Sequence, residues 1–133
     1  MKSRETLIRL KKFQVDEKRR KVAQIETMIA EFERMANDLE REIRVEQDRA
    51  GIHDPGHFAY PTYAKAALAR RENLRHSAEE LRTQLEDAKV ALQEACDERR
   101  KVELLGERER NAEARAQADA DPLAILRSRA ALA

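Results

Sequence analysis

Two histidines four residues apart, His53 and His57, are the side chains of this sequence best suited to hold a metal ion. Pro55 and Gly56 lie between them, however, and deny the helical geometry that would aim both imidazoles at one ion. No cysteine or third histidine lies nearby in the sequence to complete a ligand set. The sequence therefore predicts neither a metal site nor a cofactor.

Carboxylates are plentiful, but they occupy positions typical of solvated helix faces, with neighbours of opposite charge. No nucleophile motif, glycine-rich phosphate loop or zinc-ligand spacing is present. A general acid or base needs a desolvated site that tunes its pKa, and the pattern indicates none. We therefore expect a protein that is not an enzyme.

The basic cluster EKRRK at residues 17–21, together with Lys11 and Lys12, is the best candidate for a phosphate-binding patch. Acidic side chains interrupt it, and the formal net charge of the whole chain is only +1. We expect no nucleic-acid partner. A charged coiled-coil face is the commoner explanation, and we interpret the cluster as part of a protein-binding end, together with DERRKVELLGERER at residues 97–110.

The composition is typical of a long helix or a coiled coil. Of 133 residues, 40% are charged and 4% aromatic, which leaves too little bulky apolar material for a globular core. The single cysteine, Cys96, makes no internal disulfide and favours a reducing compartment. Since no apolar run is long enough for a signal peptide or a membrane span, we expect a cytoplasmic protein.

Apolar residues recur every seven positions in two long segments, which predicts two helices that pair as a coiled coil. Each segment carries two such series, and together they form one continuous seam per helix. The members are Ile8, Val15, Val22, Ile29, Ala36, Ile43 and Ala50 with Ile25, Phe32 and Leu39, and then Ala67, Leu74, Leu81, Ala88, Ala95 and Val102 with Ala78, Leu85 and Leu92.

A single short stretch rich in Gly, Pro, His and aromatic residues separates the two segments and predicts a sharp reversal. Gly51 suits the end of the first helix, and Pro61 suits the start of the second. The predicted fold class is all-α: an antiparallel two-helix coiled-coil hairpin over residues 1–115, with a helix at 4–50, a loop at 51–60 and a helix at 61–115. The Ala-rich tail at 116–133 has two possible interpretations. One is a short final helix that begins at Asp121 and Pro122, and the other is a disordered, frayed end.

Folding about the loop near residues 54 and 55 places Ile43 opposite Ala67, Phe32 opposite Ala78, and Ile25 opposite Leu85. In the first two pairs a large residue faces a small one, as knobs entering holes require, which an internal hairpin explains better than a parallel homodimer. Charge agrees, because residues 23–54 carry four basic and nine acidic side chains, whereas residues 55–78 carry four basic and one acidic. We expect a monomer when the protein is free.

Two further features of the pattern predict local structure. Gly106 interrupts the seam and predicts a local opening there; the alternative is a helix that is nearing its end. In the loop, Phe58 and Tyr60 are expected to close the open end of the hairpin; the alternative is that the loop aromatics present an exposed contact patch.

Three segments together resemble the FliJ family of flagellar type III export: the opening LIRLKKFQVDEKRRKVAQIE, the reversal near AGI, and the late ERRKVELLGERER. The second helix of that family often ends in the form R-K-x-E-x-L-x-x-R, and this sequence has Arg100, Lys101, Glu103, Leu105 and Arg108 at those places. The resemblance covers about residues 4–115.

The resemblance implies a cytoplasmic, non-enzymatic two-helix stalk, similar to the rotary shaft of F-type ATPases and peripheral to the flagellar export gate at the inner membrane. Members of the family enter the central hole of a hexameric export ATPase with the end that bears both termini, and they contact the export gate membrane protein and export chaperones. Carried onto this chain, the ATPase-facing residues are Arg9, Lys11, Lys12, Arg100, Lys101, Glu103, Leu105 and Arg108.

The loop end carries a second set of predicted partner contacts, Phe58, Tyr60 and Tyr63. The Pro- and His-bearing loop and the Ala-rich tail depart from the general pattern of the family. From the residues alone, the alternative function is a generic coiled-coil adaptor or oligomerisation module.

Overall fold

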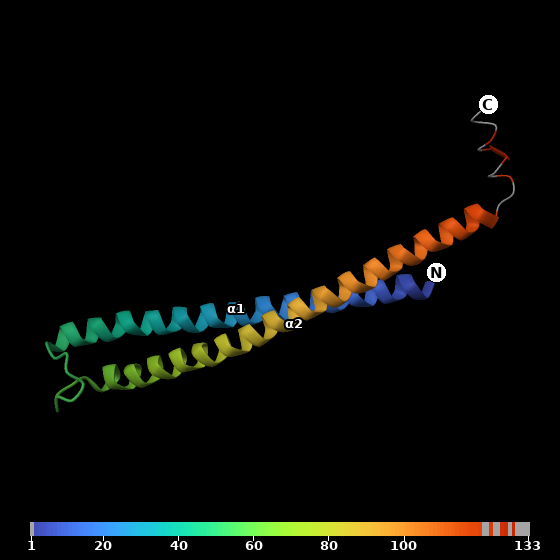
Figure 1. Cartoon of the computed structure of the whole chain (residues 1–133). Coiled ribbons are helices and arrows are strands. Elements are labelled where there is room, and N and C mark those ends of the chain that lie inside the picture. Colours follow the sequence, from blue (N-terminus) through green and yellow to red (C-terminus); the bar gives the residue numbers. More distant parts are fainter. Residues whose placement is uncertain (1, 121–122, 124–125, 128, 130–133) are drawn as a thin grey trace. The chain divides into compact units, whose positions relative to one another are not determined.

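A computed structural model of the chain describes residues 2–120, 123, 126–127 and 129. It contains two long helices, α1 (Lys2–Ala50) and α2 (Thr62–Ala120), and no strand among the described residues (Figure 1). The helices pack against each other in antiparallel fashion, so the predicted all-α hairpin is confirmed. The chain divides into two compact units, which we call unit 1 (Met1–Asp16 with Gln93–Ala133) and unit 2 (Glu17–Leu92).

The reversal between the helices is built by local backbone hydrogen bonds. Gly51 takes the left-handed conformation with φ of 71°, as predicted. Its N–H and that of Ile52 both donate to the carbonyl of Gln47, at 2.8 and 3.2 Å, which satisfies a carbonyl that the helix end leaves unpaired. At the other side of the loop the carbonyl of Pro61 accepts the first helical hydrogen bond, from Lys65 N–H at 3.0 Å, so α2 begins at Thr62.

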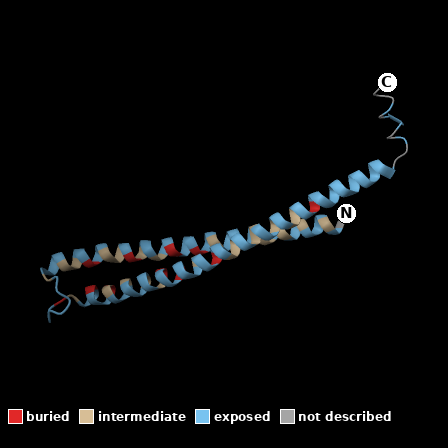
Figure 2. Cartoon of the chain, in the orientation of Figure 1, coloured by how far each residue is buried: buried red, intermediate tan, exposed pale blue. Residues whose placement is uncertain are grey.

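The heptad pattern identifies the buried seam of unit 2. Ile25, Ile29, Leu81 and Ala88 form a buried cluster, and the half-buried Val22, Phe32 and Leu85 pack against it. Buried residues lie along the α1 and α2 sides of this interface in Figure 2. Leu85 packs on the cluster that contains Ile25, as the predicted register requires. The apolar stripes of the two helices thus cover each other and leave the water.

Ion pairs across unit 2 fit the same register. Arg71 on α2 donates to the carboxylate of Glu40 on α1, and Arg82 donates to Glu33. The acidic stretch of α1 therefore lies beside the basic stretch that follows the loop, as the charge distribution predicted.

One seam assignment was wrong: Ala50 is exposed, because α1 ends there and the loop begins before α2 can cover it.

Unit 1 has a thinner core than unit 2. Val15 is fully buried there, whereas Ile8, Ala95 and Val102 are only half-buried. The predicted local opening at Gly106 is wrong, because Gly106 is buried and a Cβ atom added to it would lie 3.2 Å from Arg4 Cδ and 3.4 Å from Ile8 Cδ1. The missing side chain lets α1 approach α2 closely at this level.

The C-terminal end of α2 extends past the predicted boundary. The helix continues to Ala120, five residues beyond the expected end at residue 115, and every side chain from residue 107 to residue 120 is exposed. Asp121 and Pro122, which were expected to begin a final helix, lie outside the described part of the chain.

Candidate functional site

Two basic residues of α1 form three ion pairs with α2 in unit 1. Arg4 Nη1 lies 3.3 Å from Glu109 Oε2 and 3.7 Å from Glu113 Oε1, and the Arg4 side chain is only 11% exposed. About two turns further along α1, Lys11 Nζ lies 3.7 Å from Glu98 Oε2. The aliphatic stem of Arg4 lies against Gly106 of α2 while its charged end reaches the carboxylates.

An apolar patch lies between the ion pairs of Arg4 and the ion pair of Lys11. On α1, Leu7 follows Arg4 by three residues and precedes Lys11 by four, so the three side chains lie on one side of the helix. On α2, Leu105 follows Glu98 by seven residues and precedes Glu109 by four, so it shares their side in the same way. Because Arg4 pairs with Glu109 and Lys11 with Glu98, Leu7 and Leu105 lie on the same face of unit 1.

This face is exposed although it is apolar. Leu105 is 56% exposed, and Leu7 and Leu10 on α1 are exposed as well. We call Leu7, Leu10 and Leu105 the leucine patch. The neighbouring Leu104 is 51% exposed but projects about 100° around α2 from Leu105, away from the patch. Exposed apolar residues gathered on one face are a common mark of a protein-binding surface.

The predicted ATPase-facing residues all lie in unit 1, but they do not form one surface. Lys11 is half-buried by its pairing with Glu98, and Glu103 is half-buried with one carboxylate oxygen 3.8 Å from Arg99 Nε. The remaining side chains are exposed and distributed around both helices: Arg9, Lys12, Arg100, Lys101, Leu105 and Arg108.

Sequence reasoning missed Leu7, Leu10 and Arg4. The two leucines fall outside the heptad series, and this was the available signal: an apolar residue that the seam does not use has no partner within the hairpin. Arg4 gave no such signal, since an arginine near a chain end is usually solvated. Its role depends on the carboxylates of Glu109 and Glu113, which only the folded pairing places beside it.

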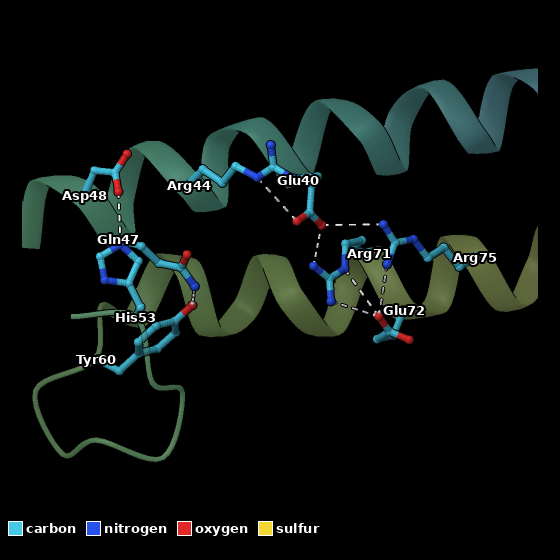
Figure 3. Close-up of polar contacts among 9 residues, drawn as sticks. All are labelled: Glu40, Arg44, Gln47, Asp48, His53, Tyr60, Arg71, Glu72 and Arg75. Carbon is cyan, nitrogen blue, oxygen red and sulfur yellow. Dashed lines mark hydrogen bonds and ion pairs between the residues drawn. The ribbon is translucent and has the colours of Figure 1, made fainter. Parts of the chain in front are cut away.

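The loop aromatics have three different environments. Tyr60 is buried, and its hydroxyl oxygen accepts a hydrogen bond from Gln47 Nε2 at 2.8 Å, so it closes the end of the hairpin as expected (Figure 3). Phe58 does not, because it is 96% exposed. Tyr63 is exposed, and its hydroxyl donates to Glu42 Oε2 at 2.5 Å, which raises the pKa of the phenol. Of these three aromatic residues, Phe58 and Tyr63 are exposed and can contact a partner, whereas Tyr60 is buried.

A charged network on unit 2 centres on Glu40 (Figure 3). Its carboxylate accepts a hydrogen bond from Arg71, and Arg75 Nη2 lies 3.5 Å away. The hydrogen bond from Arg71 lowers the pKa of Glu40 below its ordinary value, and this effect exceeds the opposing effect of burial. Glu40 therefore stays ionised at neutral pH and serves the packing of the helices, since a general acid would need a raised pKa.

The described part of the chain holds neither a metal-ion cluster nor a membrane span. No three His, Cys, Asp or Glu side chains gather there where they could hold a metal ion. His53 Nε2 instead lies 3.0 Å from Asp48 Oδ1, which places this histidine against α1. No helix in the described residues is both long and apolar enough to cross a membrane.

Comparison with protein-family models, with characterised proteins and with solved structures gives no match to this chain. The leucine patch of unit 1 and the exposed Phe58 and Tyr63 of unit 2 are therefore the surfaces from which we infer function.

Proposed function

We propose that this chain is a non-enzymatic component of the flagellar type III protein export apparatus and that unit 1 binds the ring of the export ATPase. In this role it couples the ATPase to the export gate and to export chaperones, on the cytoplasmic side of the inner membrane. The observation that carries the proposal is the leucine patch, which lies in the same unit as the segment that resembles the FliJ family.

The chemistry of unit 1 suits insertion into a ring. Burial of the leucines against a partner is favourable, because the hydrophobic free energy gained is roughly 25 cal/mol per Å² of apolar surface removed from water. The exposed Lys101 precedes Leu105 by four residues and so lies beside it on α2, where its charge favours a lumen with acidic side chains. Such a contact needs no chemistry from the chain itself, in keeping with the expected absence of a catalytic site.

The decisive experiment compares two adjacent leucines of similar exposure. Full-length protein is titrated against the purified flagellar export ATPase, and binding and ATP hydrolysis are measured. Leu105→Glu places a charge in the leucine patch, so we expect binding to weaken at least about tenfold. Leu104→Glu adds the same charge on a different side of α2 and should leave binding within about twofold. Far-UV circular dichroism verifies that both variants remain helical.

The results separate three cases. If the wild-type chain neither binds the ATPase nor changes its hydrolysis rate, the proposal is wrong. If both leucine variants weaken binding equally, the ATPase contacts a different surface of unit 1. If Leu105→Glu weakens binding and Leu104→Glu does not, the leucine patch is the surface that contacts the ATPase.

The second candidate function is a coiled-coil adaptor or oligomerisation module, which the same exposed leucines favour because two copies could bury them against each other. Light scattering at several concentrations distinguishes the two functions. A dimer that becomes monomeric in Leu105→Glu supports the module, whereas a wild-type monomer at all concentrations supports the ATPase contact.

A further inference from the structure

The loop at residues 51–61 is held by hydrogen bonds in two successive turns. Asp54 begins the first: its carbonyl accepts the His57 N–H at 3.0 Å, and its carboxylate accepts the Gly56 N–H at 2.9 Å. The second begins at His57, whose carbonyl accepts the Tyr60 N–H at 3.1 Å. His57 Nδ1 also accepts the N–H of Ala59, at 3.0 Å. These bonds fix the backbone on both sides of Phe58.

The loop is tied to α1 at two points. The buried Tyr60 receives a hydrogen bond from Gln47, and His53 lies against Asp48; both contacts are visible in Figure 3. Residues 54–60 are therefore a supported platform. An ordered platform loses little conformational entropy when a partner binds, which favours affinity.

Phe58 is the side chain that this platform presents. Its ring stacks on the imidazole of His57, with centroids 4.7 Å apart, yet the residue remains 96% exposed. A phenyl ring with this exposure does not stabilise the hairpin by burial. The loop is able to bury an aromatic ring, because Tyr60, two residues later, is buried. The exposed ring is thus available to an outside partner.

The charge of the loop indicates which class of partner fits. Residues 51–61 contain no Lys or Arg, whereas a surface that binds anionic lipid needs several. A protein pocket fits better, because it can enclose one aromatic ring and needs no net positive charge around it.

His57 adds a polar requirement for that pocket. Its Nδ1 accepts the Ala59 N–H, so in the neutral ring the proton resides on Nε2, which is left as a donor beside Phe58. A partner that encloses Phe58 also meets this N–H and must supply an acceptor for it, a carboxylate or a carbonyl oxygen.

We infer that the loop is a second protein-binding site, in which Phe58 enters an apolar pocket of a partner protein and His57 Nε2 donates a hydrogen bond to an acceptor at the rim of that pocket. The site uses residues of unit 2 alone, so it does not depend on the ATPase contact proposed for unit 1, and either can fail without the other.

Photo-crosslinking identifies the partner in the cells that make the protein. Benzoylphenylalanine is placed in the full chain at residue 58 and, as a control, at the exposed Val90 of α2. We expect the variant with the crosslinker at residue 58 to form a covalent adduct with one protein. The variant with the crosslinker at Val90 should form no adduct with that protein. Mass spectrometry of the adduct must locate the attachment in an apolar pocket with a carboxylate or carbonyl oxygen at its rim.

The identified protein is then purified and titrated with full-length variants. Phe58→Ala should weaken binding by about 10- to 100-fold, the effect of failing to bury one phenyl ring. Phe13→Ala is the matched control, because Phe13 is also exposed but lies in unit 1, and it should bind as the wild type does. His57→Asn retains an acceptor for the Ala59 N–H and loses the Nε2 donor, so we expect a loss of about 2- to 10-fold.

Three results would overturn the inference. The first is the absence of an adduct from residue 58, and the second is an adduct only with lipid or with another copy of this chain. The third is a purified partner whose affinity is unchanged by Phe58→Ala.

Discussion

Replacing Gly106 by alanine and by leucine measures how closely α1 and α2 approach each other in unit 1. The heptad pattern predicts an opening at this glycine, whereas the structure has the glycine buried against Arg4 and Ile8. The two interpretations give opposite expectations for a large side chain at this position. An opening would accept leucine and bury it, but a close approach would not.

The structure sets the magnitude of both changes. Alanine is about 1 kcal/mol more favourable than glycine inside a helix. Its Cβ would lie 3.2 Å from Arg4 Cδ and 3.4 Å from Ile8 Cδ1, so these side chains must shift by a few tenths of an ångström, and both are flexible. We expect Gly106→Ala to raise the free energy of unfolding by about 0.5 to 1 kcal/mol. The further carbons of leucine displace Ile8 and separate the helices, so Gly106→Leu should be about 1 to 3 kcal/mol less stable than Gly106→Ala.

Urea unfolding followed by far-UV circular dichroism gives these free energies. Ala69→Gly serves as the reference for helix propensity, because Ala69 is exposed in the interior of α2; it should lower the free energy of unfolding by about 1 kcal/mol. If Gly106→Leu is as stable as Gly106→Ala or more so, the helices are open at this level and the close approach is refuted.

Three further predictions address unit 2. Ile43→Ala removes one of the largest fully buried side chains, so the free energy of unfolding should fall by about 2 to 5 kcal/mol in the urea assay; a loss below about 1 kcal/mol would contradict its burial. Because Arg71 lowers the pKa of Glu40, the stabilisation from the ionised carboxylate is present above the ordinary pKa of 4.5 and is lost as the pH falls through the lowered value. The stability difference between the wild type and Glu40→Gln should therefore disappear in acid, and a difference independent of pH would disprove this assignment. Tyr60→Phe deletes the acceptor for Gln47, which should cost about 0.5 to 1.5 kcal/mol and speed hydrogen exchange of the loop amides; unchanged exchange would show that this bond does not hold the loop.

The amino-acid sequence by itself determined the helices, the seam and the register of their pairing. A seven-residue apolar repeat leaves a stripe that a helix must bury, and a single reversal leaves the other helix as the nearest cover. The position of that reversal then sets which residues meet. It predicts Ile25 and Leu85 in the same layer, and Leu85 packs on the buried cluster of unit 2 that contains Ile25. Gly51 marked the end of α1 because few other residues adopt its conformation.

Only the tertiary structure decided which residues outside the seam are covered. Phe58 and Tyr60 are both aromatic residues of one loop, and the sequence placed both at the end of the hairpin. The turns at Asp54 and His57 direct Tyr60 to Gln47 and leave Phe58 in water. Periodicity describes one helix at a time, so it cannot say how closely a neighbouring helix approaches a glycine, or which carboxylates come within reach of an arginine. Those outcomes depend on distances between residues far apart in the sequence.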